Sequence, residues 1–206
     1  MGQRLIPLLL ERGHKVTAVA RRGSEQKLSA GCDVVVANVM DRREWQHHLR
    51  DSQTLVHLVG VAHPSPAKAQ QFIDVDLRSA REAIAAAKDA RLRHFVYVSV
   101  AHPAPAMKEY IRVRATCEQE IAQAGLTATI LRPWYVLGPG HWWPLALLPF
   151  YKIAERVPTT ADGAKRLGLV KLREMIAAVT RAVENPPGGI RVVDVPSIRQ
   201  AAREMR

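Results

Sequence analysis

The chain has 206 residues, of which 48% are hydrophobic and 24% charged, and its formal net charge is +11. This length and apolar content are sufficient for one globular domain with a sizeable core, and they exclude a disordered chain. Cys32 and Cys117 show neither metal-ligand spacing nor a disulfide framework, which favours a reducing cytoplasm. The positive charge attracts anions, but the Lys and Arg residues are dispersed, so we expect a solvated basic surface and no specific nucleic-acid site.

No transmembrane segment is predicted. The longest apolar run, 142–151, is interrupted by Pro144 and Pro149 and is shorter than the roughly 20 residues that span a bilayer. No signal peptide is predicted either, because residue 1 leads directly into a charged helix. We therefore expect a cytoplasmic protein.

The first elements in the chain are a helix and a short strand. Residues 2–12 place Leu5, Leu8 and Leu9 on one face at helical spacing, and Gly13 then supplies a left-handed stop. Residues 16–20 follow as an apolar strand. A helix that feeds a buried strand is the second half of a βαβ unit, and the first strand of that unit is not in this sequence.

Strands and helices then alternate to the end of the chain. We predict strands at 33–37, 54–59, 95–99, 127–131 and 190–193, and helices at 41–50, 69–90, 109–124 and 172–184. The strands are continuous Val, Ile and Leu runs, which indicates that helices cover both faces of the sheet. The fold class is therefore α/β with a doubly wound parallel sheet, in one domain over residues 1–206. Ligands of such sheets lie beyond the carboxyl ends of the strands.

Two of the loops after strands share the frame V-x-V-A-H-P-x-P-A, at 59–67 and 98–106. If the two strands are neighbours, His63 and His102 lie near each other at the ligand edge. Convergent loop chemistry is the alternative explanation, because each proline imposes extended backbone after a strand. We do not count either imidazole among the catalytic residues on this pattern alone.

Three segments resemble the short-chain dehydrogenase/reductase superfamily. They are HFVYVSV at 94–100, YIRVRATCE at 110–118 and ATILRPWYVLG at 128–138. The chain is most similar to the atypical and extended branch: NmrA-like proteins, NAD-dependent epimerases/dehydratases and the nucleotide-binding accessory subunit of respiratory complex I. The resemblance implies a Rossmann-like domain with a small C-terminal substrate-side subdomain, in which residues 134–170 form a substrate or lid region.

The family begins with a strand and a glycine-rich G-x-x-G-x-x-G turn, and Gly2 stands where the third glycine would be. We therefore expect a Rossmann-like sheet that lacks its first strand, in an N-terminally truncated chain. Either a misplaced start or a real truncation accounts for this pattern. In the family this turn and the following helix N-terminus hold the cofactor's pyrophosphate.

The resemblance implies further cofactor contacts. Members that choose NAD carry an acid at the end of the second strand, but this chain has Arg21 and Arg22 there, and guanidinium groups suit a 2′-phosphate. NADP is therefore the favoured cofactor, with NAD as the alternative. The other predicted cofactor-binding positions are Asn38 and Val39 beside the adenine, Gly60 beside a ribose, and Pro133, Val136, Tyr110 and Arg114.

The family's catalytic residues are a serine, a tyrosine and a lysine four residues after the tyrosine. Ser99, Tyr110 and Arg114 match these positions, with Tyr110 as general acid, Arg114 as its electrostatic partner and Ser99 as a substrate-orienting hydroxyl. Arg114 departs from the pattern, because a guanidinium differs in shape from an ammonium and cannot release its proton. A half-buried structural tyrosine is the alternative for Tyr110.

Two functions remain open. The first is an NADP-linked oxidoreductase or epimerase-like enzyme that acts on a small apolar carbonyl or quinone-like substrate, since tryptophans and leucines crowd 134–151. The second is a non-enzymatic dinucleotide sensor or assembly subunit, which the arginine at position 114 favours. Residues 141–151 are also expected to offer a contact for a membrane surface or a protein complex.

Overall fold

The structure is a computed structural model in which residues 1–104, 106–138 and 167–204 are described. The strands are β1 (Thr17–Ala20), β2 (Asp33–Val36), β3 (Thr54–His57), β4 (His94–Val98), β5 (Ala128–Leu131), β6 (Tyr135–Leu137), β7 (Leu169–Lys171) and β8 (Ile190–Val193). The helices are α1 (Gly2–Glu11), α2 (Ala69–Gln71), α3 (Arg78–Asp89), α4 (Lys108–Gln123), α7 (Leu172–Glu184) and α8 (Val195–Glu204).

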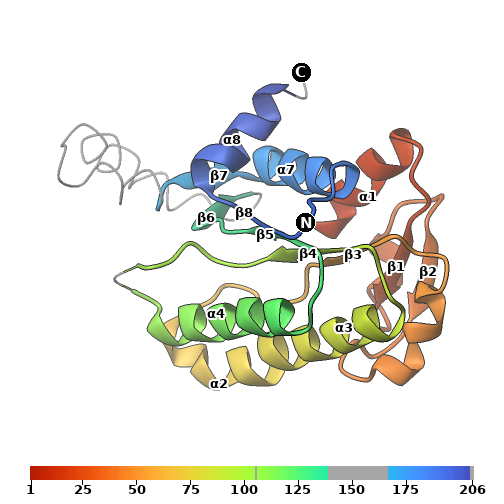
Figure 1. The fold of residues 1–206 in the computed structure, drawn as a ribbon, viewed down its shortest axis with the longest axis horizontal. Helices are drawn as coiled ribbons and strands as arrows, with labels where there is room; N and C mark the ends of the chain where they lie inside the picture. Colours follow the sequence, from red (N-terminus) through yellow and green to blue (C-terminus); the bar gives the residue numbers. More distant parts are fainter. Residues whose placement is uncertain (105, 139–166, 205–206) are drawn as a thin grey trace.

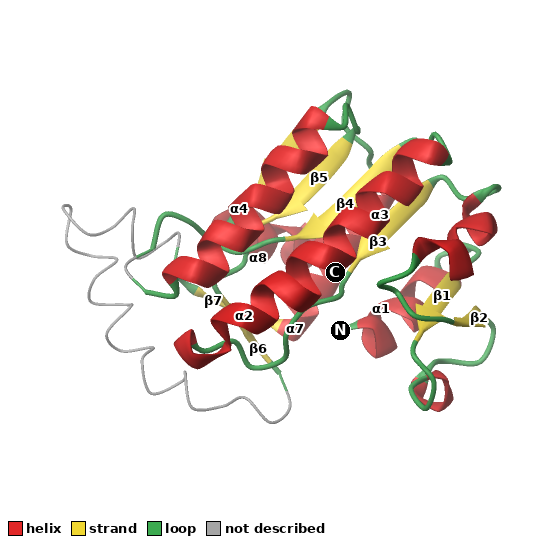
Figure 2. Ribbon diagram, turned by 90° about the horizontal axis from the view of Figure 1, so that it is seen from below, coloured by secondary structure: helices red, strands yellow, loops and turns green. Residues whose placement is uncertain are grey.

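All paired strands run parallel, as the continuous apolar runs predict. One sheet has the order β3-β4-β5-β8, and β1 pairs with β2 in a separate two-stranded sheet. Within the described residues, β1 is paired only with β2, and β3 only with β4. Among the described residues, the sheet is therefore interrupted between β3 and β1 (Figure 2).

Helices cover both faces of the main sheet. In Figure 1, α1, α7 and α8 lie above the strands, and α2, α3 and α4 lie below them. Alternate residues of β4 pack in the two hydrophobic cores on opposite faces of the sheet. Phe95 and Tyr97 belong to the core cluster of α3 and α4, whereas Val96 belongs to the cluster of α1, α7 and α8. All three side chains are almost fully buried. The prediction of a doubly wound α/β sheet is confirmed.

Some elements differ from the sequence predictions. The helix predicted over 41–50 is two short 3-10 segments, Arg42–Glu44 and Gln46–Leu49. Asp41 caps the first of them by accepting from the Arg43 amide, but the Glu44 carboxylate accepts from the Asn38 amide instead of returning to Asp41. This side-chain contact replaces the reciprocal capping box that would favour a longer helix.

The predicted helix over 69–90 is composite. Its middle, Phe72–Leu77, is a π-helix that joins α2 to α3. Such segments are rare and are found frequently at functional sites. The strands β6 and β7 and the helix α8 were not predicted. Most of the predicted substrate or lid region, 139–166, lies outside the described residues, as does the predicted contact segment 141–151.

Candidate functional site at the carboxyl ends of the strands

The N-terminus of α1 lies beside the loop that follows β3. A Cβ placed on Gly2 would lie 3.9 Å from Leu58 Cδ1, just beyond the end of β3. Leu5 and Leu9 anchor α1 in the core against α7 and β4, so that its first turn is held at this edge. The backbone amides of a helix's first turn lack partners within the helix and favour an anion.

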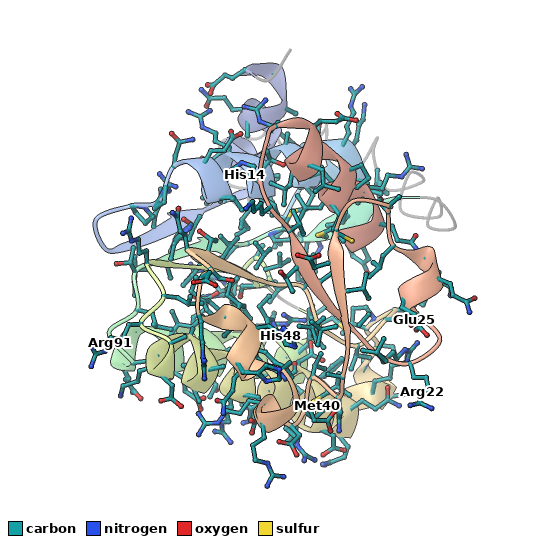
Figure 3. All side chains as sticks on the ribbon, turned by 90° about the vertical axis from the view of Figure 1, so that its right-hand side faces the viewer. His14, Arg22, Glu25, Met40, His48 and Arg91 are labelled. Carbon is teal, nitrogen blue, oxygen red and sulfur yellow. The ribbon has the colours of Figure 1, made fainter. Side chains whose placement is uncertain are left out.

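Two arginines follow β1 at the same end of the sheet. Arg21 and Arg22 are exposed, and Arg21 Nε donates to Ser24 Oγ at 3.3 Å. Arg22 and Met40, in the loops after β1 and β2, both lie in the lower part of Figure 3. Because β1 and β2 are parallel, both loops start at the carboxyl ends of their strands.

The loop after β2 carries the two residues predicted to contact an adenine. Asn38 is exposed and Val39 is half-buried. The side-chain oxygen of Asn38 accepts from the Met40 backbone amide at 3.1 Å, and the backbone amide of Asn38 donates to Glu44 Oε2 at 2.8 Å. Both bonds stay within the segment that follows β2 and give it a defined turn. The backbone amide and the side-chain oxygen of Asn38 are therefore already hydrogen-bonded to neighbouring residues.

Arg114 occupies the centre of the site, buried below the end of β4. Nη1 donates to the Val98 carbonyl at 2.7 Å and to the Tyr97 hydroxyl at 3.3 Å, and Nη2 donates to the Asp76 carboxylate. Burial by itself lowers the pKa of Arg114, but Tyr97, Tyr110 and Asp76 raise it, and the net shift is upward. The guanidinium is therefore a permanent buried cation with a fixed set of acceptors.

Asp76 joins this cation to the loop after β3. It is fully buried on the π-helix, and its second oxygen accepts from the Val61 amide at 3.0 Å. A Cβ on Gly60 would overlap Arg114 Nη2 and lie 3.1 Å from Asp76 Oδ1. The glycine at position 60 thus leaves room for the ion pair.

The Tyr110 ring packs between Arg114 and Phe72. The Arg114 Cζ lies 5.2 Å from the Tyr110 ring centroid, and the Phe72 and Tyr110 centroids are 4.9 Å apart. Burial raises the pKa of Tyr110, although the Arg114 charge acts in the opposite direction. The phenol therefore retains its proton in neutral water.

Ser99 belongs to a second polar cluster, which is centred on Glu118 one turn beyond Arg114. The Ser99 hydroxyl donates to Glu118 Oε1 at 2.5 Å, and Arg132 Nε donates to the same oxygen at 3.1 Å. Arg132 Nη2 donates to Oε2, and His102 Nε2 lies 3.4 Å from Oε1. The Glu118 side chain is only 8% exposed, and these donors supply hydrogen bonds to its buried oxygens.

Arg114 contacts the end of β4 and Tyr110 packs on Arg114, whereas Ser99, just after β4, contacts Glu118. Pro133 is buried and its carbonyl accepts from the Ala101 amide at 2.9 Å, which ties the loops after β4 and β5 together. Val136 is half-buried in β6. Sequence reasoning missed Asp76 and Glu118, although Glu118 continues the i, i+4 spacing of Tyr110 and Arg114.

A comparison with known protein families shows which family this chain belongs to. A protein-family model described as NAD(P)H-binding matches residues 1–138. The chain belongs to this family. Its doubly wound parallel sheet is a Rossmann-type fold, in agreement with the resemblance seen in the sequence motifs.

Three curated relatives are more distantly similar. Sterol demethylase protein B of Methylococcus capsulatus is 26% identical over 166 residues, which covers 70% of this chain and 51% of that protein. A 4-hydroxy-2-methyl-3-oxo-4-farnesyl-3,4-dihydroquinoline-1-oxide ketoreductase of Stigmatella aurantiaca is 24% identical, covering 92% and 63%. Ceramide reductase of Caulobacter vibrioides is 21% identical, covering 97% and 62%. The chain therefore spans 51–63% of the length of these relatives.

Solved structures show the same fold. The Bordetella bronchiseptica enzyme WbmH, in complex with NAD+, has a TM-score of 0.68 at 21% identity, covering 94% of this chain and 71% of that one. UDP-glucose 4-epimerase of Thermus thermophilus, in complex with NAD, has a TM-score of 0.67 at 17% identity, covering 98% and 78%.

The positions described above suit a nicotinamide dinucleotide. The exposed guanidinium groups after β1 and the first turn of α1 both favour an anion, and Arg114 Nε is a buried donor with no hydrogen-bond partner.

In the described ranges, no helix is long and apolar enough to cross a membrane, and no group of three or more His, Cys, Asp or Glu side chains is placed to hold a metal ion.

Proposed function

We propose that this protein is an NADP(H)-dependent oxidoreductase that reduces an apolar carbonyl or quinone-like substrate. The observation that carries the proposal is the buried cation of Arg114 beside Tyr110 at the end of β4, in a chain of the NAD(P)H-binding family. A reduced nicotinamide supplies a hydride to such a substrate when it is bound. The α1 N-terminus and Arg21 and Arg22 would hold its phosphates, and Asn38 and Val39 would border its adenine.

In this proposal the side chains around Arg114 hold the substrate. Tyr110 would donate a hydrogen bond to the substrate oxygen and, as general acid, pass its proton to that oxygen as the alcohol forms, while the fixed charge of Arg114 favours the phenolate that is left. Ser99 donates to Glu118 and so organises the neighbouring cluster. Pro133 and Val136 would border a bound nicotinamide.

The proposed substrate class follows from the relatives and from the composition of the chain. The names of the two reductases describe a farnesyl-bearing ketone and a ceramide, both of which have extended apolar parts. Trp134 and Tyr135, at the described start of the predicted lid region, form an edge-to-face aromatic pair with ring centroids 5.8 Å apart. An apolar substrate suits such a surface better than a nucleotide sugar does.

The function is tested by binding and turnover with defined probes. We expect NADPH to bind in a fluorescence titration, and acetophenone or menadione to be reduced with consumption of NADPH. Tyr110→Phe removes only the hydroxyl, so it should leave NADPH affinity unchanged and reduce turnover at least about tenfold, the scale of one hydrogen bond to a charged group. NADPH binding without turnover of either probe would contradict the reductase proposal.

The alternative function is a dinucleotide sensor without catalysis. It is favoured by one observation, the commitment of Arg114 to Asp76, Val98 and Tyr97, which leaves no mobile ammonium beside Tyr110. A sensor would bind NADPH, show no turnover in the parent protein and be unaffected by Tyr110→Phe.

Cofactor choice is predicted to depend on Arg21 and Arg22. Changing both to alanine should weaken NADPH binding at least about tenfold, because one or two charge-assisted hydrogen bonds to the 2′-phosphate are lost. NADH binding should change less. Arg91→Asn with Arg93→Ala is the matched control, since it removes two exposed charges at the opposite ends of the strands. An equal loss for NADPH and NADH would show that the arginines act by general attraction.

A further inference from the structure

The loop after β1 begins with a tight turn over residues 21–24. The Ser24 backbone amide donates to the Arg21 carbonyl at 3.0 Å, and Gly23 has a φ of 81°. A Cβ on Gly23 would meet no atom within 4 Å, so the glycine is required by the left-handed backbone and not by a lack of space. The turn brings two side chains together, because Arg21 Nε donates to Ser24 Oγ at 3.3 Å.

The Ser24 hydroxyl keeps a proton that the turn does not use. Ser24 precedes the 3-10 segment Glu25–Lys27, but its side chain makes no capping hydrogen bond to that segment. A hydroxyl has one donor and two acceptor lone pairs, and here Arg21 donates to one of those lone pairs. Among the residues that the structure describes, no acceptor takes the Ser24 proton. This proton is therefore free to be donated to a ligand.

The turn is a cluster of donors with a net positive charge. Arg21 and Arg22 are both exposed. Within the described residues, Arg21 donates through Nε alone, which leaves both Nη groups for an acceptor outside the turn. Glu25 and Lys27 on the next segment carry opposite charges, so the arginines supply the positive excess. Guanidinium and hydroxyl donors of this kind suit the oxygens of a phosphate monoester.

This turn lies beside the loop that is proposed to border the adenine. The Ala37 amide donates to the Ala20 carbonyl at 3.0 Å, so the loops after β1 and β2 leave the sheet next to each other. Asn38 and Val39 follow directly in the second loop. The 2′-phosphate of NADP(H) is joined to the ribose that carries the adenine, and an adenine at Asn38 and Val39 therefore brings this phosphate to the side of the molecule where the turn lies.

We infer that Ser24 is a specificity-determining residue, whose hydroxyl donates to the 2′-phosphate of NADP(H) while its oxygen holds the Arg21 guanidinium toward the same phosphate. This inference rests on the proposed NADP(H)-dependent function. NADH has a neutral hydroxyl at this position, and a hydrogen bond to a neutral group contributes less than one to an anion. Ser24 thus stabilises bound NADPH more than bound NADH.

The test removes the hydroxyl from the turn and leaves both arginines in place. We expect Ser24→Ala to weaken NADPH binding about tenfold in a fluorescence titration, the scale of one hydrogen bond to a charged group, and to leave NADH affinity unchanged. Ser24→Thr retains a hydroxyl and should restore most of the NADPH affinity. Ser29→Ala is the matched control, because it removes a hydroxyl from the same loop outside the turn, and it should leave both affinities unchanged.

A second titration separates the phosphate from the nicotinamide. Adenosine 2′,5′-bisphosphate and adenosine 5′-monophosphate differ only in the 2′-phosphate, and both can be measured as competitors of NADPH. Ser24→Ala should weaken binding of the bisphosphate about tenfold and leave binding of the monophosphate unchanged.

The outcomes separate this inference from the proposed function. An unchanged NADPH affinity in Ser24→Ala, or an equal loss for NADPH and NADH, would overturn the role of Ser24. The NADP(H) assignment would stand in both cases if Arg21→Ala with Arg22→Ala still lost NADPH selectively. A parent protein that binds NADPH no more tightly than NADH would overturn the cofactor assignment and this inference together.

Discussion

Asp76→Ala should lower the free energy of unfolding by about 3–5 kcal/mol, the cost of removing one partner from a buried ion pair. Asp76 is fully buried, and the side chain of its partner Arg114 is only 6% exposed. The Asp76→Ala substitution would leave the Arg114 guanidinium without its carboxylate partner and the Val61 backbone amide without its acceptor. Urea titration at neutral pH measures the difference, with midpoint and slope compared between the parent and the variant.

An exposed ion pair on α4, the helix that carries Arg114, is the control. Arg112 donates to Glu109 at 2.8 Å, with side chains 59% and 52% exposed. Because such pairs contribute little, Glu109→Ala should change the free energy of unfolding by less than about 1 kcal/mol. If Asp76→Ala had an effect as small as Glu109→Ala, then Asp76 would not neutralise a buried charge, and our account of Arg114 as a fixed cation would be wrong.

Most of the fold could be predicted from the sequence, because the patterns that determine it are local. The helix at 172–184 was predicted with the bounds of α7, and the strand at 190–193 with those of β8. Continuous apolar runs identified a sheet covered on both faces, and the alternating burial of Phe95, Val96 and Tyr97 explains why. The helix over 41–50 was wrong because the Glu44 side chain contacts the Asn38 amide, a choice that spacing alone does not determine.

The site was predicted less completely, because its contacts join residues far apart in the sequence. Asp76 lies 38 residues before Arg114, inside a stretch that reads as an ordinary helix, and nothing local marks it as the partner of a cation. Glu118 continues the spacing of Tyr110 and Arg114, but its contacts with Ser99 and Arg132 depend on how α4 packs below β4 and β5. Position 60 was expected to need glycine for a ligand, and in the structure the Arg114 side chain already occupies the space that a Cβ would need.

His57, at the end of β3, is expected to make the fold sensitive to acid. Its ring is buried 5.6 Å from the Tyr97 ring centroid, and burial, together with the Arg114 charge, lowers its pKa from 6.5 to about 3. In the unfolded chain the same imidazole takes up a proton near pH 6.5. Between these values the unfolded state binds one more proton than the folded state, so stability falls as the pH falls.

The expected slope is about 1.4 kcal/mol per pH unit from this one histidine, between pH 6 and pH 4. His57→Leu removes the titrating group and keeps an apolar side chain at the position, so its free energy of unfolding should depend less steeply on pH by about that amount. His94, whose burial lowers its pKa to about 4, remains in both proteins and contributes equally to both slopes. His48→Leu alters an exposed histidine and should retain the parent slope. Urea titrations at several pH values give the slopes, and identical slopes for the parent and His57→Leu would mean that His57 is not held neutral within the fold.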